Sequence, residues 1–301
     1  MNVSHNRAFE WISQDLQPFV LGFLVLMAGA RFFYVLWPKL IVLKRAPFED
    51  RFKNPVKRLG NTVHIAILQA RMFKETKTGW MHALIFWGFL IFLARAAWFF
   101  FIGFFPEVTF EEGGLEALYA LLKDIFIVLV TLAASYALYR RIVVRPERLT
   151  LSMEGVVILI LILAIMISDA LFDAGWQARN PQASMDGIWL GSLVASMLLV
   201  FEADTVVHLH NLAYWTHVVC ILYFLTMLPD SKHFHIITSI PNVFFANISE
   251  GGNELHRIAF ENEELQSYGV SKIEEFSWKK LLDLHTCTEC GRCDVVCPAL
   301  A

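Results

Sequence analysis

Long apolar runs separated by short polar segments dominate the first 230 residues of the chain. A helix needs about 20 apolar residues to cross roughly 30 Å of hydrocarbon. Five runs reach that length and predict membrane-spanning helices at residues 18–43, 79–105, 117–139, 151–171 and 206–228. The N-terminal residues show no cleavable signal, so we expect the first run to remain as a membrane anchor.

A sixth apolar run, residues 187–201, is only fifteen residues long and is bounded by Asp186 and Glu202. This length predicts a short interfacial or re-entrant helix on the outer side of the membrane instead of a sixth span. The five long runs therefore predict an all-α integral membrane protein, a five-span helical bundle.

The composition agrees with a membrane protein and excludes one class of partner. Hydrophobic residues make up 56% of the chain and charged residues only 18%, whereas soluble domains are usually about a quarter charged. The net charge of -3 gives no basic field for binding a nucleic acid. We therefore expect membrane lipid, and not nucleic acid, around this chain.

Lysine and arginine in short loops indicate the orientation of the bundle, because they concentrate on the cytoplasmic side. Nine lie at positions 44–78 and four at positions 140–150, whereas the loop 106–116 has none and carries four glutamates. This places the N-terminus outside and the residues after Asp230 on the cytoplasmic side of the membrane. Had the run 187–201 crossed the membrane, the later cysteines would lie outside.

A cysteine motif occupies residues 287–298, with the spacing C-x₂-C-x₂-C-x₃-C-P. This is the spacing of bacterial ferredoxins, in which thiolates bind a [4Fe-4S] cluster, and it predicts the ligands Cys287, Cys290, Cys293 and Cys297. Zinc is the alternative, but zinc sites usually place two cysteine pairs well apart.

The role of Cys297 leaves two possibilities open. In two-cluster ferredoxins the fourth cysteine of such a run binds the other cluster. Either Cys297 folds back to complete a single cluster, or the chain is the N-terminal part of a longer protein with a second motif. We expect the second, so that residues 281–301 begin an incomplete ferredoxin-type domain and residues 241–280 are a linker.

Three histidines at the spans are candidate ligands of haem b, and they define a haem-binding membrane domain at residues 1–240. His82 and His235 both belong at the cytoplasmic boundary, so they are predicted to be the two axial ligands of one haem. His217 lies deeper, and eighteen residues on one helix would place it on the same face as His235, about 27 Å away. A kink at Pro229 would loosen this geometry without abolishing it. The spacing suits a second, outer haem, although Phe92 stands where its other ligand is expected.

Other polar residues in the spans have weaker claims to function. His208 and His210 could contact a quinone headgroup, assist in binding the outer haem, or simply lie at the interface. Arg95 is expected to face the bundle interior and to pair with a haem propionate or with Asp169, unless it extends to the membrane surface. An intramembrane histidine can also be structural, hydrogen-bonded to a neighbouring helix.

These residues resemble the gamma (cytochrome b) subunit family of respiratory nitrate reductases. More closely, the chain is similar to bacterial proteins that fuse such a domain to a heterodisulfide-reductase-like iron-sulfur module. This group includes the membrane partner of electron-transfer flavoprotein in menaquinone reduction. The matching segments are Trp80–Phe89, Tyr214–His217, Leu228–His235 with Thr238–Phe245, and Thr286–Cys293.

The resemblance implies an oxidoreductase of a respiratory chain. Electrons would pass between menaquinone or ubiquinone, one or two b haems and a cytoplasmic iron-sulfur chain, with electron-transfer flavoprotein as a soluble donor. The reverse flow, from quinol to a heterodisulfide-type reductase, is an alternative. Another is a non-catalytic membrane anchor subunit with structural histidines. Spans broken by glycine or proline in corresponding halves, which are typical of transporters, are not found in the sequence.

Overall fold

The computed structural model describes residues 11–13, 15–105, 114–147, 149–181, 187–248, 270–293 and 297–298. The regular elements within these ranges are all helical. Five of the described helices are long and apolar enough to cross a membrane: Gln17–Arg45, Thr76–Phe104, Gly114–Val144, Met153–Arg179 and Ala203–Asp230. The predicted all-α bundle of five spans is confirmed.

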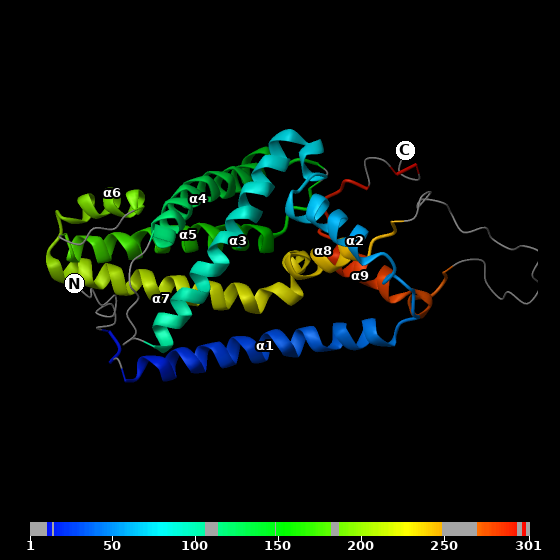
Figure 1. Ribbon diagram of the computed structural model, residues 1–301, viewed down its shortest axis with the longest axis horizontal. Helices are drawn as coiled ribbons and strands as arrows, with labels where there is room; N and C mark the ends of the chain where they lie inside the picture. Colours follow the sequence, from blue (N-terminus) through cyan, green and yellow to red (C-terminus); the bar gives the residue numbers. More distant parts are fainter. Residues whose placement is uncertain are drawn as a thin grey trace, which may run out of the picture. The chain divides into compact units, whose positions relative to one another are not determined.

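These spans are built from α-helices, two of which end in a different kind of turn (Figure 1). They are α1 (Gln17–Arg45), α3 (Thr76–Phe104), α4 (Gly114–Tyr139) with the π-helical turn η4 (Arg140–Val144), α5 (Met153–Arg179), and α7 (Ala203–Met227) with the 3₁₀ turn η5 (Leu228–Asp230). The short outer helix predicted at residues 187–201 is α6 (Trp189–Leu198).

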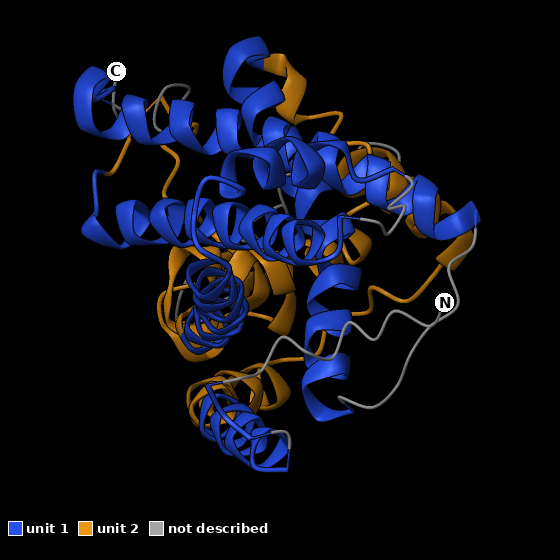
Figure 2. Cartoon of the chain, turned by 90° about the vertical axis from the view of Figure 1, so that its left-hand side faces the viewer, with its two compact units in different colours: residues 1–30, 75–147, 151–226 blue, residues 31–74, 148–150, 227–301 orange. Residues whose placement is uncertain are grey.

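The described chain divides into two compact units (Figure 2). Unit 1 comprises residues 1–30, 75–147 and 151–226, and unit 2 comprises residues 31–74, 148–150 and 227–301. This division differs from the predicted domains, because the segment after the first span belongs with the C-terminal residues. Of the predicted linker 241–280, residues 249–269 lie outside the described part of the chain.

In unit 1, α4 packs against α3 and α5, and α6 packs on α5. One hydrophobic core joins Leu21, Phe99, Phe172 and Tyr214, which come from α1, α3, α5 and α7. Helices α5 and α7 approach closely at Gly175. A Cβ atom there would lie only 2.7 Å from the Cβ of His210, so a larger residue would force the helices apart.

Unit 2 contains short helices that pack on one another. They are α2 (Pro55–Thr62), the π-helical turn η2 (Val63–Ile67), the 3₁₀ turns η3 (Met72–Lys74), η6 (Lys232–Phe234) and η7 (Ile273–Glu275), and the helices α8 (His235–Phe244) and α9 (Trp278–Thr286). Helix α8 packs against both α2 and α9. Arg58 of α2 donates hydrogen bonds to the carbonyls of Phe244 (3.0 Å) and Ala246 (2.7 Å).

Helix α7 ends well before His235, which corrects one sequence expectation. The sequence placed His235 after the predicted span and on the same helix face as His217, with a kink at Pro229 left open, but the helix does not run on to His235. The α-helix stops at Met227, two 3₁₀ turns follow, and His235 begins α8. The break has a local cause, because Pro229 has no N–H for an α-helical hydrogen bond and Ser231 is extended (φ −107°, ψ 167°).

Candidate functional site

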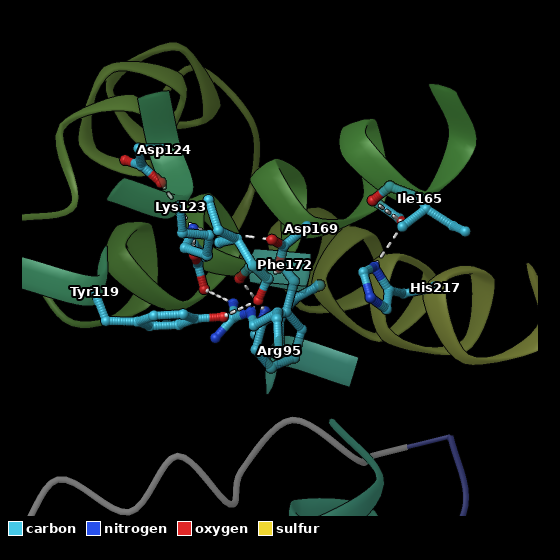
Figure 3. Close-up of polar contacts among 12 residues, drawn as sticks. Arg95, Tyr119, Lys123, Asp124, Ile165, Asp169, Phe172 and His217 are labelled. Atoms are coloured by element: carbon cyan, nitrogen blue, oxygen red, sulfur yellow. Dashed lines mark hydrogen bonds and ion pairs between the residues drawn. The ribbon is translucent and has the colours of Figure 1, made fainter. Parts of the chain in front are cut away.

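A network of buried charges lies in the interior of unit 1, where α3, α4 and α5 meet (Figure 3). Arg95 of α3 donates through Nε to Asp169 Oδ1 at 2.7 Å and through Nη2 to Asp173 Oδ1 at 2.5 Å. Asp169 and Asp173 are one turn apart on α5 and face the same way. The sequence left two partners open for Arg95, and the structure pairs it with Asp169.

Lys123 and Asp124 of α4 extend this network. Lys123 Nζ contacts Asp173 Oδ2 at 2.6 Å and Asp124 Oδ1 at 2.7 Å. The other oxygen of Asp124 accepts a hydrogen bond from the backbone N–H of Leu190 at 2.8 Å, which ties α6 to the charges. Two cations thus meet three carboxylates, and all five side chains are buried.

One carboxylate oxygen of this network is less well satisfied than the others. Asp169 is fully buried, and its Oδ2 has no hydrogen-bond partner among the described residues, with Lys123 Nζ at 3.9 Å. Charged groups inside a membrane are costly and usually serve a substrate, ion or proton path. The network is therefore a candidate functional element as well as a structural one.

His210 lies next to this network. Its Nδ1 is 2.8 Å from the carbonyl oxygen of Phe172, and its ring stacks on the Phe172 ring at 4.3 Å. A carbonyl only accepts hydrogen bonds, so Nδ1 carries the proton and Nε2 carries the lone pair. The Arg95 guanidinium lies 5.8 Å from the same Phe172 ring, so Arg95 and His210 both contact Phe172.

His217 is held in the same tautomer by a different group. Its Nδ1 lies 3.2 Å from Ser168 Oγ, and that hydroxyl donates its own proton to the carbonyl of Ile165 at 3.0 Å. Ser168 can therefore only accept from His217, which leaves Nε2 as the ring atom able to bind a metal. The ring is buried and stacks on Phe99 at 4.2 Å.

The remaining predicted residues of unit 1 are not gathered at one place. His208 is exposed and accepts a hydrogen bond from Trp11 Nε1 at 2.9 Å, so it does not join His210. Phe92 is packed in a hydrophobic core with Ile127, Val130 and Met166. His82 is half-buried on α3.

In unit 2, His235 shows the same arrangement as the histidines of α7. Its Nδ1 lies 2.7 Å from the carbonyl oxygen of Lys232, so Nε2 is again the atom with the lone pair. Burial lowers the pKa of His235 below the ordinary value, and this outweighs the hydrogen bond to Lys232, which acts in the opposite direction. His235 is therefore neutral near pH 7, the form that binds a metal.

The cysteine motif begins directly after α9, at Cys287. Cys287, Cys290 and Cys293 are exposed and Cys297 is half-buried. Glu289 and Gly291 both have positive φ, 51° and 71°, and turn the backbone between the cysteines. The predicted ligands of a [4Fe-4S] cluster thus lie on a tightly turned loop.

The donor set fits an iron-sulfur cluster by its chemistry, since four thiols at this spacing are its ordinary ligands. In the ranges that the structure covers, no three His, Cys, Asp or Glu side chains lie close enough together to hold one metal ion. His210, His217 and His235 fit haem ligation, because in each ring Nδ1 is hydrogen-bonded and Nε2 carries the lone pair.

Sequence reasoning missed three members of the charge network, Lys123, Asp124 and Asp173. A signal was present for Lys123 and Asp124, which lie inside the apolar run 117–139, whereas Asp173 lies just beyond the run 151–171. It also missed Ser168, whose type and position carry no signal, since an intramembrane serine usually bonds to its own helix.

The fold and the site define a class of protein: a helical membrane bundle with a charged interior and a ferredoxin-type cysteine motif. Similar proteins carry names of that class. The chain is 31% identical over 287 residues to the probable iron-sulfur-binding oxidoreductase FadF of Bacillus subtilis, covering 93% of this chain and 40% of that protein. It is 30% identical over 318 residues to the EtfAB:quinone oxidoreductase of Syntrophomonas wolfei, covering 99% of this chain and 42% of that protein.

A shorter match adds a third name. A probable membrane-anchored ferredoxin of Chromohalobacter salexigens is 52% identical over 33 residues, which cover 11% of this chain. The chain spans about two fifths of the length of the first two relatives. No protein-family model and no solved structure matches the chain.

Proposed function

We propose that this chain is the membrane electron-transfer part of a quinone-linked oxidoreductase. Electrons from a soluble donor such as electron-transfer flavoprotein pass through the iron-sulfur loop and b haem to a quinone, menaquinone or ubiquinone, in the bacterial inner membrane. The names of the two long relatives support this proposal, since one is an iron-sulfur-binding oxidoreductase and the other an EtfAB:quinone oxidoreductase.

The observation that carries the proposal is the shared state of His210, His217 and His235. In each ring Nδ1 donates to an oxygen, from Phe172, Ser168 and Lys232 respectively. Metal-bound histidines usually have their second nitrogen fixed in this way, which orients the ring and makes the ligand more basic. A purely structural role does not require all three rings to share one tautomer.

The roles of individual residues follow from their positions. His217 and His235 would bind haem iron through Nε2, and His82 is proposed as a further ligand. The pairing of His82 with His235 stays a prediction, because they belong to different units. His210 is added as a candidate for the missing second ligand of the outer haem or for a quinone contact. Bound haem would supply one-electron transfer within the membrane.

The cytoplasmic part would receive electrons one at a time. Cys287, Cys290, Cys293 and Cys297 would hold iron as thiolates, whether they serve one cluster or two. Reduction of a quinone to a quinol takes two electrons and two protons. The carboxylates of the charge network, Asp124, Asp169 and Asp173, are the buried groups of unit 1 that could handle those protons.

An optical spectrum tests the proposal directly. Purified protein reduced with dithionite should show the sharp alpha band of a b-type haem, and the haem should also be reduced by a menaquinol analogue. His217→Ala and His235→Ala should each lose part of that band, whereas His208→Ala, an exposed histidine on α7, should keep all of it. Protein without any b-type band would instead be a membrane anchor.

A further inference from the structure

We propose that Lys232 is a positioning residue that fixes the iron-sulfur loop beside the haem ligand His235. The inference rests on the proposed function, because it concerns the step between the two redox centres. It uses contacts within unit 2 alone, and neither the motif spacing nor the names of the relatives assign a role to this lysine.

Lys232 contacts both partners at once, with different parts of the residue. Its backbone carbonyl accepts the hydrogen bond from His235 Nδ1 at 2.7 Å and thereby orients the ring. Its side-chain Nζ lies 2.6 Å from Oε2 of Glu289. Glu289 stands between Cys287 and Cys290, at a position with φ 51°, so a contact at its side chain fixes the loop where it turns.

A second contact joins the same two segments. The ring of Phe234 meets the ring of His285 edge to face, with centroids 6.0 Å apart. Phe234 precedes His235 directly, and His285 is two residues before Cys287. The loop and the turn therefore touch on both sides of the first cysteine, once through charges and once through rings.

Two hydrogen bonds fix the start of helix α9, which precedes the cysteine loop. Lys279 Nζ lies 2.5 Å from Asn242 Oδ1 of α8, and Trp278 Nε1 donates to the carbonyl of Glu49 at 2.9 Å. These contacts hold the start of α9, but the cysteine loop follows its other end. There the ion pair between the largely buried Lys232 and the more exposed Glu289 is one contact to the loop, beside the contact of Phe234 with His285.

The consequence concerns the rate at which one electron passes from the cluster to the haem. Electron tunnelling falls steeply with distance, so a loop that moves away from His235 slows the transfer. Breaking the ion pair should therefore lower the rate of haem reduction, by a factor that grows with the distance the loop moves.

A zero-length cross-link tests the contact without any cofactor. A carbodiimide activates the Glu289 carboxylate, the Lys232 amine displaces the resulting urea, and an isopeptide bond forms with the net loss of one water. Mass spectrometry of the full-length protein should find a peptide joining Lys232 to Glu289. The Glu289→Gln variant should not give it. Absence of this peptide from the wild type would overturn the proposal.

The rate is tested by delivering one electron to the cluster with a photoreductant and following the reduced haem band. Lys232→Met and Glu289→Gln should slow its appearance, and Lys232→Arg should stay close to the wild type. Lys280→Met, which removes an exposed lysine of α9, is the matched control and should change nothing.

A charge swap separates positioning from tuning of the redox potentials. Lys232→Glu combined with Glu289→Lys restores the ion pair but reverses the charge beside each centre, so recovery of the rate would show positioning. Equal slowing in the swap and in the single variants would overturn the role of Lys232 alone. A wild type without a b-type band would overturn the proposed function, and this role with it.

Discussion

Replacing Arg95 with methionine should strongly destabilise the bundle. The substitution keeps a long apolar side chain but removes the contacts at 2.7 Å to Asp169 and 2.5 Å to Asp173. Asp173 would still have Lys123 at 2.6 Å, whereas Asp169 would have only Lys123 at 3.9 Å. The variant therefore leaves one fully buried carboxylate without a close cation.

The size of the effect follows from that geometry. Removing one partner of a buried ion pair costs about 3–5 kcal/mol, because the remaining charge stays buried. At about 2.1 cal/mol/K of unfolding entropy per residue, about 1 kcal/mol shifts the melting temperature of this chain by about 1.6 °C, so Arg95→Met should melt about 5–8 °C below the wild type. Replacing both members of a pair costs much less, so Arg95→Met with Asp169→Asn should recover a large part of the loss.

Thermal unfolding of the detergent-solubilised protein, followed by tryptophan fluorescence, measures the melting temperature of each variant. Arg31→Met is the matched control, because Arg31 also pairs with an aspartate, Asp230, at 2.5 Å, but both side chains are about half exposed. Such a surface pair contributes less than about 1 kcal/mol. The reasoning about the buried network is refuted if Arg95→Met and Arg31→Met have the same melting temperature. It is also refuted if the double variant melts no higher than Arg95→Met alone.

Three further predictions concern unit 2. Cys290→Ser should lose most of the iron-sulfur absorbance and most of the bound iron. Cys220→Ser, at a half-buried cysteine of α7, should keep both. Equal iron content in the two variants would contradict the ligand assignment. A reporter enzyme that works only in the periplasm should show no activity when it is fused after Tyr268. Activity of this fusion would contradict the predicted orientation of the bundle. Burial acts to raise the pKa of Glu49, but hydrogen bonds from Ser277 and Arg51 outweigh it and hold the pKa below 4.5. Its stabilising effect is thus complete above pH 4.5 and lost as the pH falls through the lowered pKa, so the difference in melting temperature between wild type and Glu49→Gln should disappear in acid; a difference that persists there would show that Glu49 acts otherwise.

The spans were predictable because length and hydropathy alone decide whether a helix can cross a membrane. The predicted runs fall on α1, α3, α4, α5 and α7, and the short run falls on α6. The course of the chain after α7 was not predictable, because an apolar run followed by Pro229 is compatible with a kink as well as with a stop. The second of the two 3₁₀ turns, η6, packs against α8 and α9, and these contacts are not visible in the sequence.

The site could be predicted in its residue types but not in its pairings. Arg95 and Asp169 were matched from sequence because each is an isolated charge in an apolar run of suitable depth. Lys232 and Glu289 were not, because both lie in polar segments where many other partners exist. Similarly, the tautomer of His217 depends on Ser168, and only the structure shows that Ser168 already donates its proton elsewhere.

The buried charge network has a consequence for how the protein is made. A charged residue at the centre of a lone helix costs roughly 2.5–3.5 kcal/mol on entering the membrane through the translocon. Lys123 and Asp124 are neighbours on α4 and contact each other at 2.7 Å, so that helix carries its own compensation. Helix α3 brings Arg95 without a carboxylate, and the cations that pair with Asp169 and Asp173 of α5 come from α3 and α4. These two helices should leave the insertion machinery together, after α4 has been synthesised between them, and the bundle closes when their charges meet.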